Sequence, residues 1–248
     1  MAFFSIITVT YNAESTVTAT MRSVAEQLFT DFEHIVQDGA STDATLRIVG
    51  EWATPQCLVE SEPDKGLYYA MNEALARARG EYVVFLNAGD AFHSPDTLRQ
   101  IHDAIEGCGD NRPGVAYGQT VLVDAEGHVV GKRHLDAPRE LDFRSFADGM
   151  VVCHQAFFAR RDLTCPYDTA YRFSADYDWC VKILKKSPSN CYVDDIVADY
   201  LHEGVTTANH KKSLRERFAI MCRYYGTLST CLRHLRFAGR HLKRKLIS

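Results

Sequence analysis

The sequence predicts an α/β fold in which helices cover both faces of a mainly parallel sheet. In the first hundred residues, short apolar and β-branched runs of strand length alternate with amphipathic segments of helix length. Strands joined by such helices return in the same direction through right-handed crossovers, so their sheet is parallel. The 248 residues are 46% hydrophobic, which suffices for a sizeable core. Apolar runs stay well below the roughly 18 residues of a membrane-spanning helix.

The first half is expected to contain four strands and three connecting helices. Asn12 and Ser15 supply turn and N-cap chemistry after the first strand, and the loop 38–43 caps the second helix. The expected strands are residues 3–10, 32–37, 57–60 and 82–86. The expected helices between them end near Leu28, Trp52 and Arg79.

The pattern becomes mixed beyond Pro95, which favours a smaller mixed sheet within the same domain. The expected elements are a helix to about 106, a strand near 115–117, a hairpin around 124–127, a strand over 151–159, a helix over 175–186 and a strand over 191–201. We therefore expect one α/β domain over residues 1–208, with halves 1–95 and 96–208, followed by a helical tail over 209–248.

Cysteine usage and the start of the chain bear on the compartment. The eight cysteines are scattered singly without a C-x-x-C pair, which argues against a zinc ribbon or a disulfide scaffold. The first residues lack the basic region and cleavage site of a signal peptide and lead straight into the first expected strand. A cytosolic protein with reduced thiols is expected.

The tail is strongly basic. Residues 209–248 hold eleven Lys or Arg and one acid, Glu216, a net charge of +10, whereas residues 1–208 carry −14. Apolar residues recur there at spacings of four and three, as along one face of a helix: Leu214, Phe218, Met221, Tyr225, Leu228, Leu232 and Leu235. Three interpretations stay open: a helix on anionic lipid, a helix docked on the acidic body, or a contact between two subunits in a homodimer. Nucleic acid is not expected as a partner, because no recognisable module accompanies the charge.

Four loops at the expected strand ends are candidates for chemistry. They are residues 10–14, 38–43, 61–66 and 87–90. Ligands of open α/β sheets bind outside the carboxyl ends of the strands. Burying an acid at the end of a strand costs folding free energy unless the carboxylate contacts a ligand or hydrogen-bond donors. For Asp38, Asp43 and Asp90 the competing interpretation is that each caps a helix. Neither a G-x-G-x-x-G nor a G-x-x-x-x-G-K-[ST] motif is present, so dinucleotide and P-loop sites lose their main support.

Five stretches of the chain occur in the order of a known family. They are SIITVTYNAE, VQDGASTDAT, SEPDKGLYYAMNEALARARGEYVVFLNAGD, HQAFFARR and YRFSADYDW. In these the sequence resembles family 2 glycosyltransferases of the Rossmann-like GT-A fold, the nucleotide-sugar transferases that build bacterial surface polysaccharides. It is most similar to the colanic-acid and O-antigen enzymes with L-N-x-G-D in the metal loop. The resemblance covers most of residues 4–180.

The resemblance implies a nucleotide pocket and a metal site. Asp38 would accept from the N3–H of uracil or the equivalent edge of another base, and Asp90 would hold Mn²⁺ or Mg²⁺ against the diphosphate, with His202 as a second candidate ligand. The family's usual loop is D-x-D, whereas Asn87 stands here in place of the first acid, which lowers the expected metal affinity. The implied nucleotide-binding residues are Thr10, Tyr11, Asn12, Glu14, Asp38, Lys65, Asn72, Asn87, Ala88 and Gly89.

The resemblance also implies a general base for transfer with inversion. The base of the family is the Asp of an E-D pair at a helix start, which Asp176 matches, although Ala175 replaces the Glu. Asp178 is the alternative, and both acids could instead serve the helix macrodipole. The implied sugar contacts are His154, Gln155 and Trp179, and a structural role is equally open for His154 and His202.

The expected function is therefore an inverting, metal-dependent glycosyltransferase that moves a sugar from a nucleotide-diphosphate donor, UDP-linked in the first place, to a glycan or lipid-linked acceptor. Its expected place is the cytoplasm, including the inner face of the cytoplasmic membrane. One alternative is a nucleotidyltransferase, which would show a Gly-rich basic loop near the N-terminus that residues 10–14 do not provide. The other is a degenerate nucleotide-binding scaffold, which Asn87 and Ala175 keep open.

Overall fold

The computed structural model describes residues 2–202 and 210–235, and its first half confirms the predicted alternation of strands and helices. Expected and observed boundaries agree within a few residues because apolar periodicity and turn residues act locally. The elements are β1 (Phe4–Thr10), α1 (Val17–Ala25), β2 (Phe32–Asp38), α2 (Thr45–Trp52), β3 (Cys57–Ser61), α3 (Leu67–Arg77) and β4 (Tyr82–Phe85).

The second half contains shorter strands and several 3₁₀ turns. The elements are β5 (Ala91–Phe92), α4 (Thr97–Glu106), β6 (Val115–Val123), β7 (Val129–Lys132), β8 (Phe157–Arg160), α5 (Ala175–Lys186), β9 (Asn190–Leu201) and α7 (His210–Tyr225), with 3₁₀ turns at Ser145–Asp148, His154–Ala156 and Arg161–Leu163. The expected hairpin is confirmed as β6–β7. The expected strand over 151–159 is wrong in its first part, because the chain forms the turn His154–Ala156 before it pairs as β8. The two-residue β5 was not predicted.

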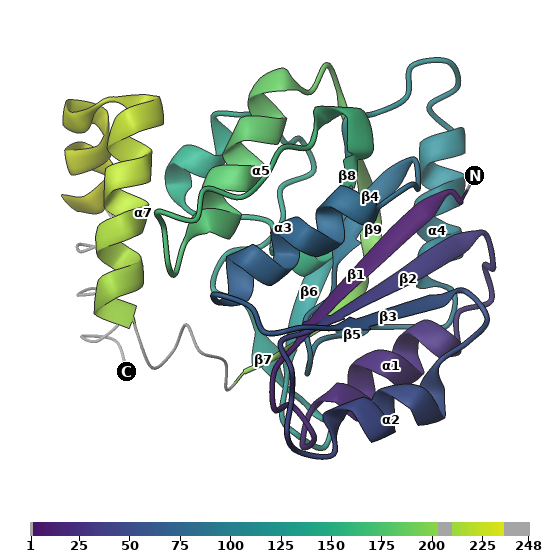
Figure 1. Ribbon diagram of the computed structural model, residues 1–248. Coiled ribbons are helices and arrows are strands. Elements are labelled where there is room, and N and C mark those ends of the chain that lie inside the picture. Colours follow the sequence, from purple (N-terminus) through teal and green to yellow (C-terminus); the bar gives the residue numbers. More distant parts are fainter. Residues whose placement is uncertain (1, 203–209, 236–248) are drawn as a thin grey trace.

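A single mixed sheet joins both halves (Figure 1). Within the described residues its order is β3-β2-β1-β4-β8-β6-β9-β5, and β7 pairs with β6. The strands β3, β2, β1 and β4 are parallel neighbours. β8 runs antiparallel to both β4 and β6, while β6 and β9 are parallel. The mixed half thus continues the parallel half through β8.

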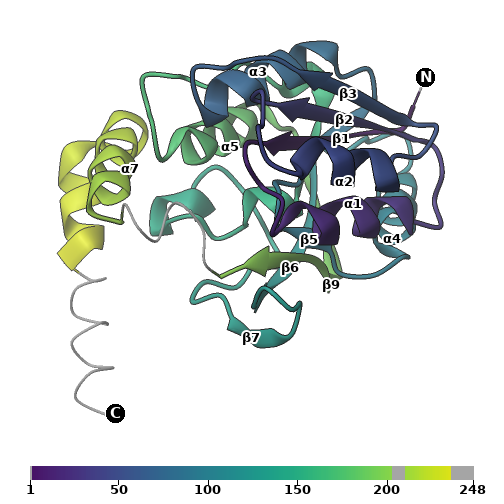
Figure 2. The same cartoon turned by 60° about the horizontal axis from the view of Figure 1, so that its bottom comes forward.

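Helices cover both faces of the parallel strands, as predicted (Figure 2). On one face, Val17 and Met21 of α1 pack with Val36 of β2 and with α2. On the other face, Met71 and Ala74 of α3 belong to the main hydrophobic core. This arrangement leaves the carboxyl ends of the strands as the edge where loops from both faces meet.

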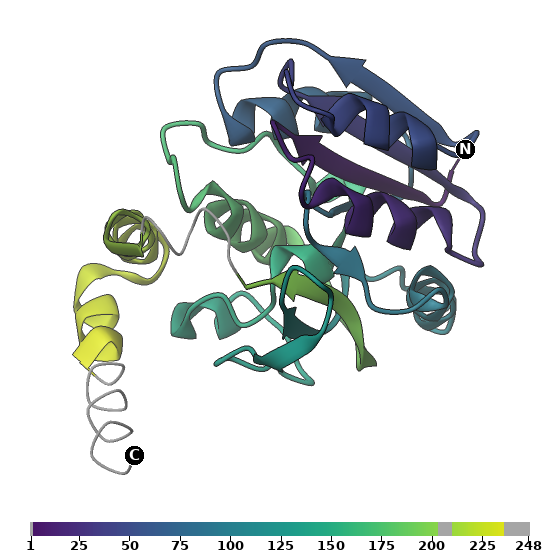
Figure 3. The same cartoon turned by 90° about the horizontal axis from the view of Figure 1, so that it is seen from below.

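The tail differs from the single long helix that the sequence predicts. Gly226 has φ +82 and separates α7 from a further helical stretch over residues 227–235. Ile220 and Met221 of α7 are buried in the main core, so α7 packs on the body beside α5 (Figure 3). The other part of the expected apolar seam faces outward: the exposed leucines are Leu214, Leu228, Leu232 and Leu235. The tail residues 236–248 lie outside the described residues.

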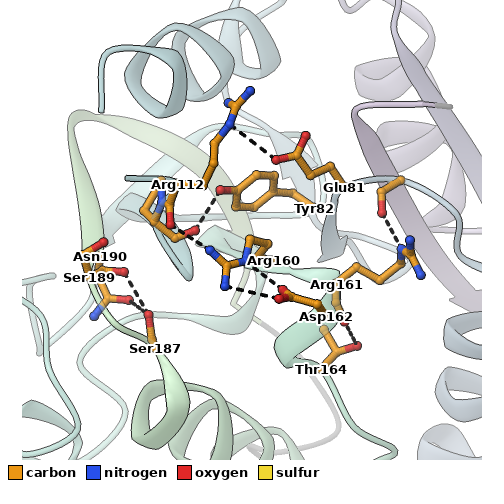
Figure 4. A network of polar contacts seen from close by, with 12 residues as sticks. Glu81, Tyr82, Arg112, Arg160, Arg161, Asp162, Thr164, Ser187, Ser189 and Asn190 are labelled. Atoms are coloured by element: carbon orange, nitrogen blue, oxygen red, sulfur yellow. Dashed lines mark hydrogen bonds and ion pairs between the residues drawn. The ribbon is translucent and has the colours of Figure 1, made fainter. Parts of the chain in front are cut away.

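A polar network braces the opposite edge of the sheet, where β4 begins and β8 ends (Figure 4). The Tyr82 hydroxyl donates to the carbonyl oxygen of Pro113 at 2.7 Å, and Arg160 donates to the carbonyl oxygen of Arg112 at 2.8 Å. Arg160 also pairs with Asp162 at 2.7 Å. These contacts join β4, β8 and the chain before β6. Their role is structural, since the candidate loops lie at the other ends of the strands.

Every helix within residues 2–202 and 210–235 is too short or too polar to cross a bilayer.

Candidate active site

The carboxyl ends of β1, β2 and β3 meet around the carboxylate of Asp38. The strand register places Thr10 and Ser61 on either side of it. Asp38 Oδ1 accepts from the hydroxyls of Thr10 at 2.9 Å and Ser41 at 2.5 Å. Asp38 Oδ2 accepts from the Ser41 N–H at 2.8 Å and from the Ser61 hydroxyl at 2.7 Å. Burial opposes ionisation, but the hydrogen bonds from Ser41, Ser61 and Thr10 outweigh it and lower the pKa of Asp38.

These four donors occupy the acceptor positions of a fully buried carboxylate. In this structure the Asp38 carboxylate therefore joins three strand ends, and its contact with a nucleotide base stays a prediction. Thr10 is buried in the same cluster, and its nucleotide contact likewise stays a prediction.

The loops after β1 and β2 are locked together by reciprocal hydrogen bonds. The side-chain oxygen of Asn12 accepts from the Thr42 N–H at 2.9 Å, and the Asn12 N–H donates to Ser41 Oγ at 2.8 Å. Glu14 Oε2 accepts from the Ala44 N–H at 2.9 Å, at the start of α2. Asn12 and Glu14 thus stiffen the wall of the site, and their nucleotide contacts stay predictions.

Asp90, the expected metal ligand, is a buried carboxylate held on both oxygens. Gln155 Nε2 donates to Oδ2 at 2.6 Å, and the Leu201 N–H donates to Oδ1 at 3.1 Å. Burial raises the pKa of Asp90 to about 7, although the hydrogen bonds from Gln155 and Leu201 oppose the shift. The preceding Gly89 has φ +102, and a Cβ there would lie 2.7 Å from Leu201 Cδ2. Only glycine fits this turn.

The residues around Asp90 fit a divalent cation that shares its coordination with a diphosphate. Within the described ranges, no group of three or more His, Cys, Asp or Glu side chains is arranged to hold a metal by itself. Asp90 retains acceptor capacity, and a cation would offset the unfavourable ionisation that burial imposes. Asn87 Oδ1 is buried without a hydrogen-bond partner among the described residues, which offers a second oxygen. His202 is exposed and follows Leu201, whose N–H touches Asp90.

Asp176, the expected base, opens α5 and lies beside two side chains from distant segments. The Tyr68 hydroxyl is 3.3 Å from its Oδ1, and His154 Nδ1 is 3.6 Å from its Oδ2. His154 Nε2 lies 3.2 Å from Asn87 Nδ2, in the loop that also carries Asp90. Burial lowers the pKa of His154, and the Asp176 charge only partly offsets this effect. A neutral imidazole thus lies between the expected base and the expected metal loop.

Asp178, the alternative base, occupies a different environment. It is fully buried, while the Asp176 side chain is 17% exposed. Lys182 Nζ lies 2.6 Å from Asp178 Oδ2, and the Tyr224 hydroxyl donates to Oδ1 at 2.9 Å. Asp178 is therefore engaged in joining α5 to α7.

The model of the family described as Glycosyl transferase family 2 matches residues 5–164, more than half of the chain. The chain belongs to this family. The match includes the loops that carry Asp38 and Asp90, and it confirms the family that the sequence motifs indicated. The chain is therefore an enzyme of the predicted class, a glycosyltransferase. The family match argues against the alternative of a nucleotidyltransferase.

Relatives extend the similarity over most of the transferase. A PGL/p-HBAD biosynthesis glycosyltransferase from Mycobacterium tuberculosis is 32% identical over 213 residues, which is 83% of this chain and 76% of the relative. The UDP-Glc:alpha-D-GlcNAc-diphosphoundecaprenol beta-1,3-glucosyltransferase WfgD from Escherichia coli is 27% identical over 222 residues, covering 88% of this chain and 84% of that protein.

Solved structures confirm the GT-A fold. TarS 1–349 from S. aureus in complex with UDP-GlcNAc superposes with a TM-score of 0.71 at 20% identity, covering 98% of this chain and 73% of TarS 1–349. The mannosyltransferase PcManGT from Pyrobaculum calidifontis in complex with GDP-Man and Mn²⁺ gives a TM-score of 0.68 at 21% identity, covering 94% of this chain and 70% of PcManGT.

Three further predicted site residues of the transferase are engaged by other parts of the protein in this structure. Trp179 is fully buried, donates to the Cys165 carbonyl oxygen at 2.8 Å and stacks on Tyr167, so in this structure it packs the core. Both polar atoms of the Asn72 side chain bind the backbone of Tyr167, at 3.0 and 2.7 Å. Gln155 is buried against Asp90 and orients its carboxylate.

Other predicted residues remain available to a ligand. Tyr11 is 67% exposed, and Lys65 is exposed at the end of the loop after β3. Ala88 is partly exposed between Asn87 and the buried Gly89.

Sequence reasoning missed two side chains that shape the site. Tyr68 lies next to Asp176, and Ser61 holds Asp38. Tyr68 stands two residues after Gly66 in one of the quoted motifs, and Ser61 ends an expected strand. The sequence therefore indicated that both residues lie near the site, but it did not indicate their hydrogen-bond partners, which lie in other segments of the chain.

Proposed function

We propose that this transferase moves a sugar with inversion from a nucleoside diphosphate donor, UDP-linked in the first place, to a glycan or lipid-linked acceptor of surface polysaccharide synthesis. The observation that carries the proposal is the placement of Asp176. Of the two acids in the first turn of α5, Asp176 has the partly exposed side chain, and His154 contacts both Asp176 and Asn87 of the loop that carries Asp90. TarS in complex with UDP-GlcNAc and the name of WfgD support a UDP-linked donor and a lipid diphosphate acceptor.

Donor binding would use the exposed side chains around the stiffened loops. The ring of Tyr11 offers a face for a nucleobase, and the Lys65 ammonium offers a charge for the phosphates. Asp90 and His202 would hold Mn²⁺ or Mg²⁺, as PcManGT with GDP-Man and Mn²⁺ suggests. When bound, the cation neutralises the leaving diphosphate. Gln155 and the Leu201 N–H keep the Asp90 carboxylate in one orientation for that purpose.

The transfer step needs one proton acceptor and one leaving group. As the acceptor oxygen attacks the anomeric carbon, Asp176 takes the hydroxyl proton. The bond from that carbon to the diphosphate oxygen breaks, and the electron pair leaves with the nucleoside diphosphate. Attack from the face opposite the leaving group inverts the configuration. Tyr68 and His154 restrict the rotation of the Asp176 carboxylate, which keeps it aimed at the acceptor.

A pair of carboxamide variants tests the base. Asp176→Asn should keep UDP affinity in calorimetry and lose transfer from UDP-glucose to a synthetic GlcNAc-diphospholipid by about 10²- to 10⁴-fold. Asp178→Asn is the matched control, because it changes the same chemistry two residues away and should lower stability more than turnover. Full transfer by Asp176→Asn would refute the assignment. Transfer by the wild type also separates an enzyme from a nucleotide-binding scaffold.

The tail supports a peripheral place on the inner face of the cytoplasmic membrane, which we add to the proposal. Leu228, Leu232 and Leu235 are 77%, 54% and 70% exposed on the helical stretch 227–235. Residues 209–248 carry a net charge of +10, and cations near an anionic bilayer contribute about 1 kcal/mol each. A lipid-linked acceptor would place the enzyme at that surface.

Vesicle sedimentation tests the tail. The full chain should sediment with vesicles that contain anionic lipid, less so as salt is raised, and Leu232→Asp should weaken this binding. Leu28→Asp is the matched control, since Leu28 is 62% exposed on the body. If the full chain does not sediment with anionic vesicles and light scattering shows a dimer, the tail contacts a second copy of the chain and not the membrane.

A further inference from the structure

The single acid of the basic tail binds the backbone that leads into the helix of the proposed base. Glu216 is the one Asp or Glu among residues 209–248. Its Oε1 accepts from the Arg172 N–H at 2.9 Å, and its Oε2 accepts from the Phe173 N–H at 2.7 Å. Two successive amide groups thus point at one carboxylate. Such charge-assisted hydrogen bonds are about twice as strong as neutral ones.

The segment that Glu216 holds directly precedes Asp176. Residues 172–174 enter α5, and Asp176 is the second residue of that helix. The N-cap residue Ser174 makes no capping hydrogen bond of its own and contacts the carbonyl oxygen and the hydroxyl of Ser213, both at 3.1 Å. The start of α5 is therefore held from α7, since its own N-cap side chain is turned toward Ser213.

Further contacts of α7 fix the rest of the first turn of α5. The Tyr224 hydroxyl donates to Asp178 at 2.9 Å, and the Arg217 guanidinium lies 5.6 Å from the ring centre of Tyr177. Ile220 and Met221 are buried between these polar contacts. Figure 1 shows α7 alongside α5, and Figure 2 shows the same pair from another side. The residues on either side of Asp176 in the chain are thus held by α7, while Tyr68 and His154 lie beside its carboxylate.

We propose that Glu216 is a positioning residue for sugar transfer and that it acts through Asp176. The proposal rests on the role of Asp176 as base given above. By holding the entry to α5, Glu216 sets where the carboxylate of Asp176 stands relative to the acceptor hydroxyl. A displacement of about 1 Å at a reacting group can cost about 100-fold in rate. A purely structural acid would instead affect only folding stability.

The test compares Glu216→Ala with Arg215→Ala in the full chain. Arg215 is the exposed neighbour on the same helix and serves as the matched control. Turnover is followed as UDP release from UDP-glucose with Mn²⁺ and the GlcNAc-diphospholipid in neutral detergent micelles, which present no anionic bilayer to the tail cations such as Arg215. We expect Glu216→Ala to lower kcat by about 10- to 100-fold, with donor KM and UDP affinity within twofold of the wild type. Glu216→Asp, which keeps the carboxylate, should recover part of the loss, and Arg215→Ala should match the wild type.

A double variant separates action through Asp176 from an independent effect. In the Asp176→Asn background, adding Glu216→Ala should change the residual rate by less than twofold, because the group that Glu216 positions is already disabled. Amide hydrogen exchange over residues 172–178 should be faster in Glu216→Ala than in Arg215→Ala, and this readout needs no turnover.

Several results would overturn the inference. A kcat of Glu216→Ala within twofold of the wild type, a rate loss that multiplies with that of Asp176→Asn, or unchanged exchange over 172–178 each contradict it. If Asp176→Asn alone keeps full transfer, the assignment of the base fails, and a low kcat of Glu216→Ala then shows that α7 matters for another reason. The two failures are therefore distinguishable.

Discussion

Replacement of Asp90 by Asn should stabilise the metal-free protein at alkaline pH while it removes activity. Asp90 is 5% exposed, and its pKa is raised from 3.8 to about 7 because burial disfavours the charged form. The folded state therefore binds this proton more tightly than the unfolded chain does. The protonated carboxyl favours folding at low pH, and this contribution is lost as pH rises from about 4 to about 7.

The magnitude follows from the pKa difference and from the two donors on Asp90. One pKa unit corresponds to about 1.4 kcal/mol, so ionised Asp90 destabilises the fold by about 4 kcal/mol above pH 7. The Asn variant has no such charge, but its amide group faces either Gln155 Nε2 or the Leu201 N–H. One lost hydrogen bond costs about 1 kcal/mol. The expected net gain at pH 8 is about 3 kcal/mol.

Urea unfolding of the wild type and Asp90→Asn at pH 5 and pH 8 with EDTA measures this difference. The advantage of the variant should be about 2 to 3 kcal/mol larger at pH 8 than at pH 5, because Asp90 is mostly protonated at pH 5. At pH 8, adding Mn²⁺ to a solution that contains UDP should further stabilise the wild type and leave the variant unchanged. An Asn variant that is less stable than the wild type at pH 8, or an advantage independent of pH, would refute the reasoning.

The remaining predictions concern residues whose environment the structure redefines. Asp38→Ala leaves the hydroxyls of Thr10, Ser41 and Ser61 without their acceptor, so the free energy of unfolding should fall by about 2 to 4 kcal/mol and UDP affinity should fall with it. If calorimetry finds that UDP affinity is lost while stability is unchanged, Asp38 contacts the base directly. Trp179→Phe should lower the melting temperature and leave donor and acceptor KM unchanged, since the indole is fully buried; a KM change without a stability change would contradict this. Truncation after residue 208 should cause aggregation because it uncovers the core around Ile220, whereas truncation after Gly226 should leave a folded protein that binds UDP. If light scattering finds both truncated chains monodisperse, α7 is not needed for folding.

Much of the fold and the location of the site followed from local properties of the sequence. β-branched runs, helical periodicity and turn residues act over a few positions, so β1 to β4 and the intervening helices were predicted closely. Because the carboxyl ends of parallel strands share one edge, the loops with Asp38 and Asp90 were correctly assigned to that edge. The motifs identified the family on the same residues.

The tertiary structure alone decided which of these side chains are engaged by distant parts of the chain and which stay exposed. Asp176 and Asp178 share a helix and a chemistry, but Tyr224, 46 residues further along the chain, engages only Asp178. Asn72 reads as a polar site residue until Tyr167, 95 residues away, occupies its amide. Periodicity carries no information on such partners, because hydrogen bonds between distant segments depend on how the elements pack. The same reason hid the role of Glu216, an isolated acid in a basic tail whose donors belong to the entry of α5.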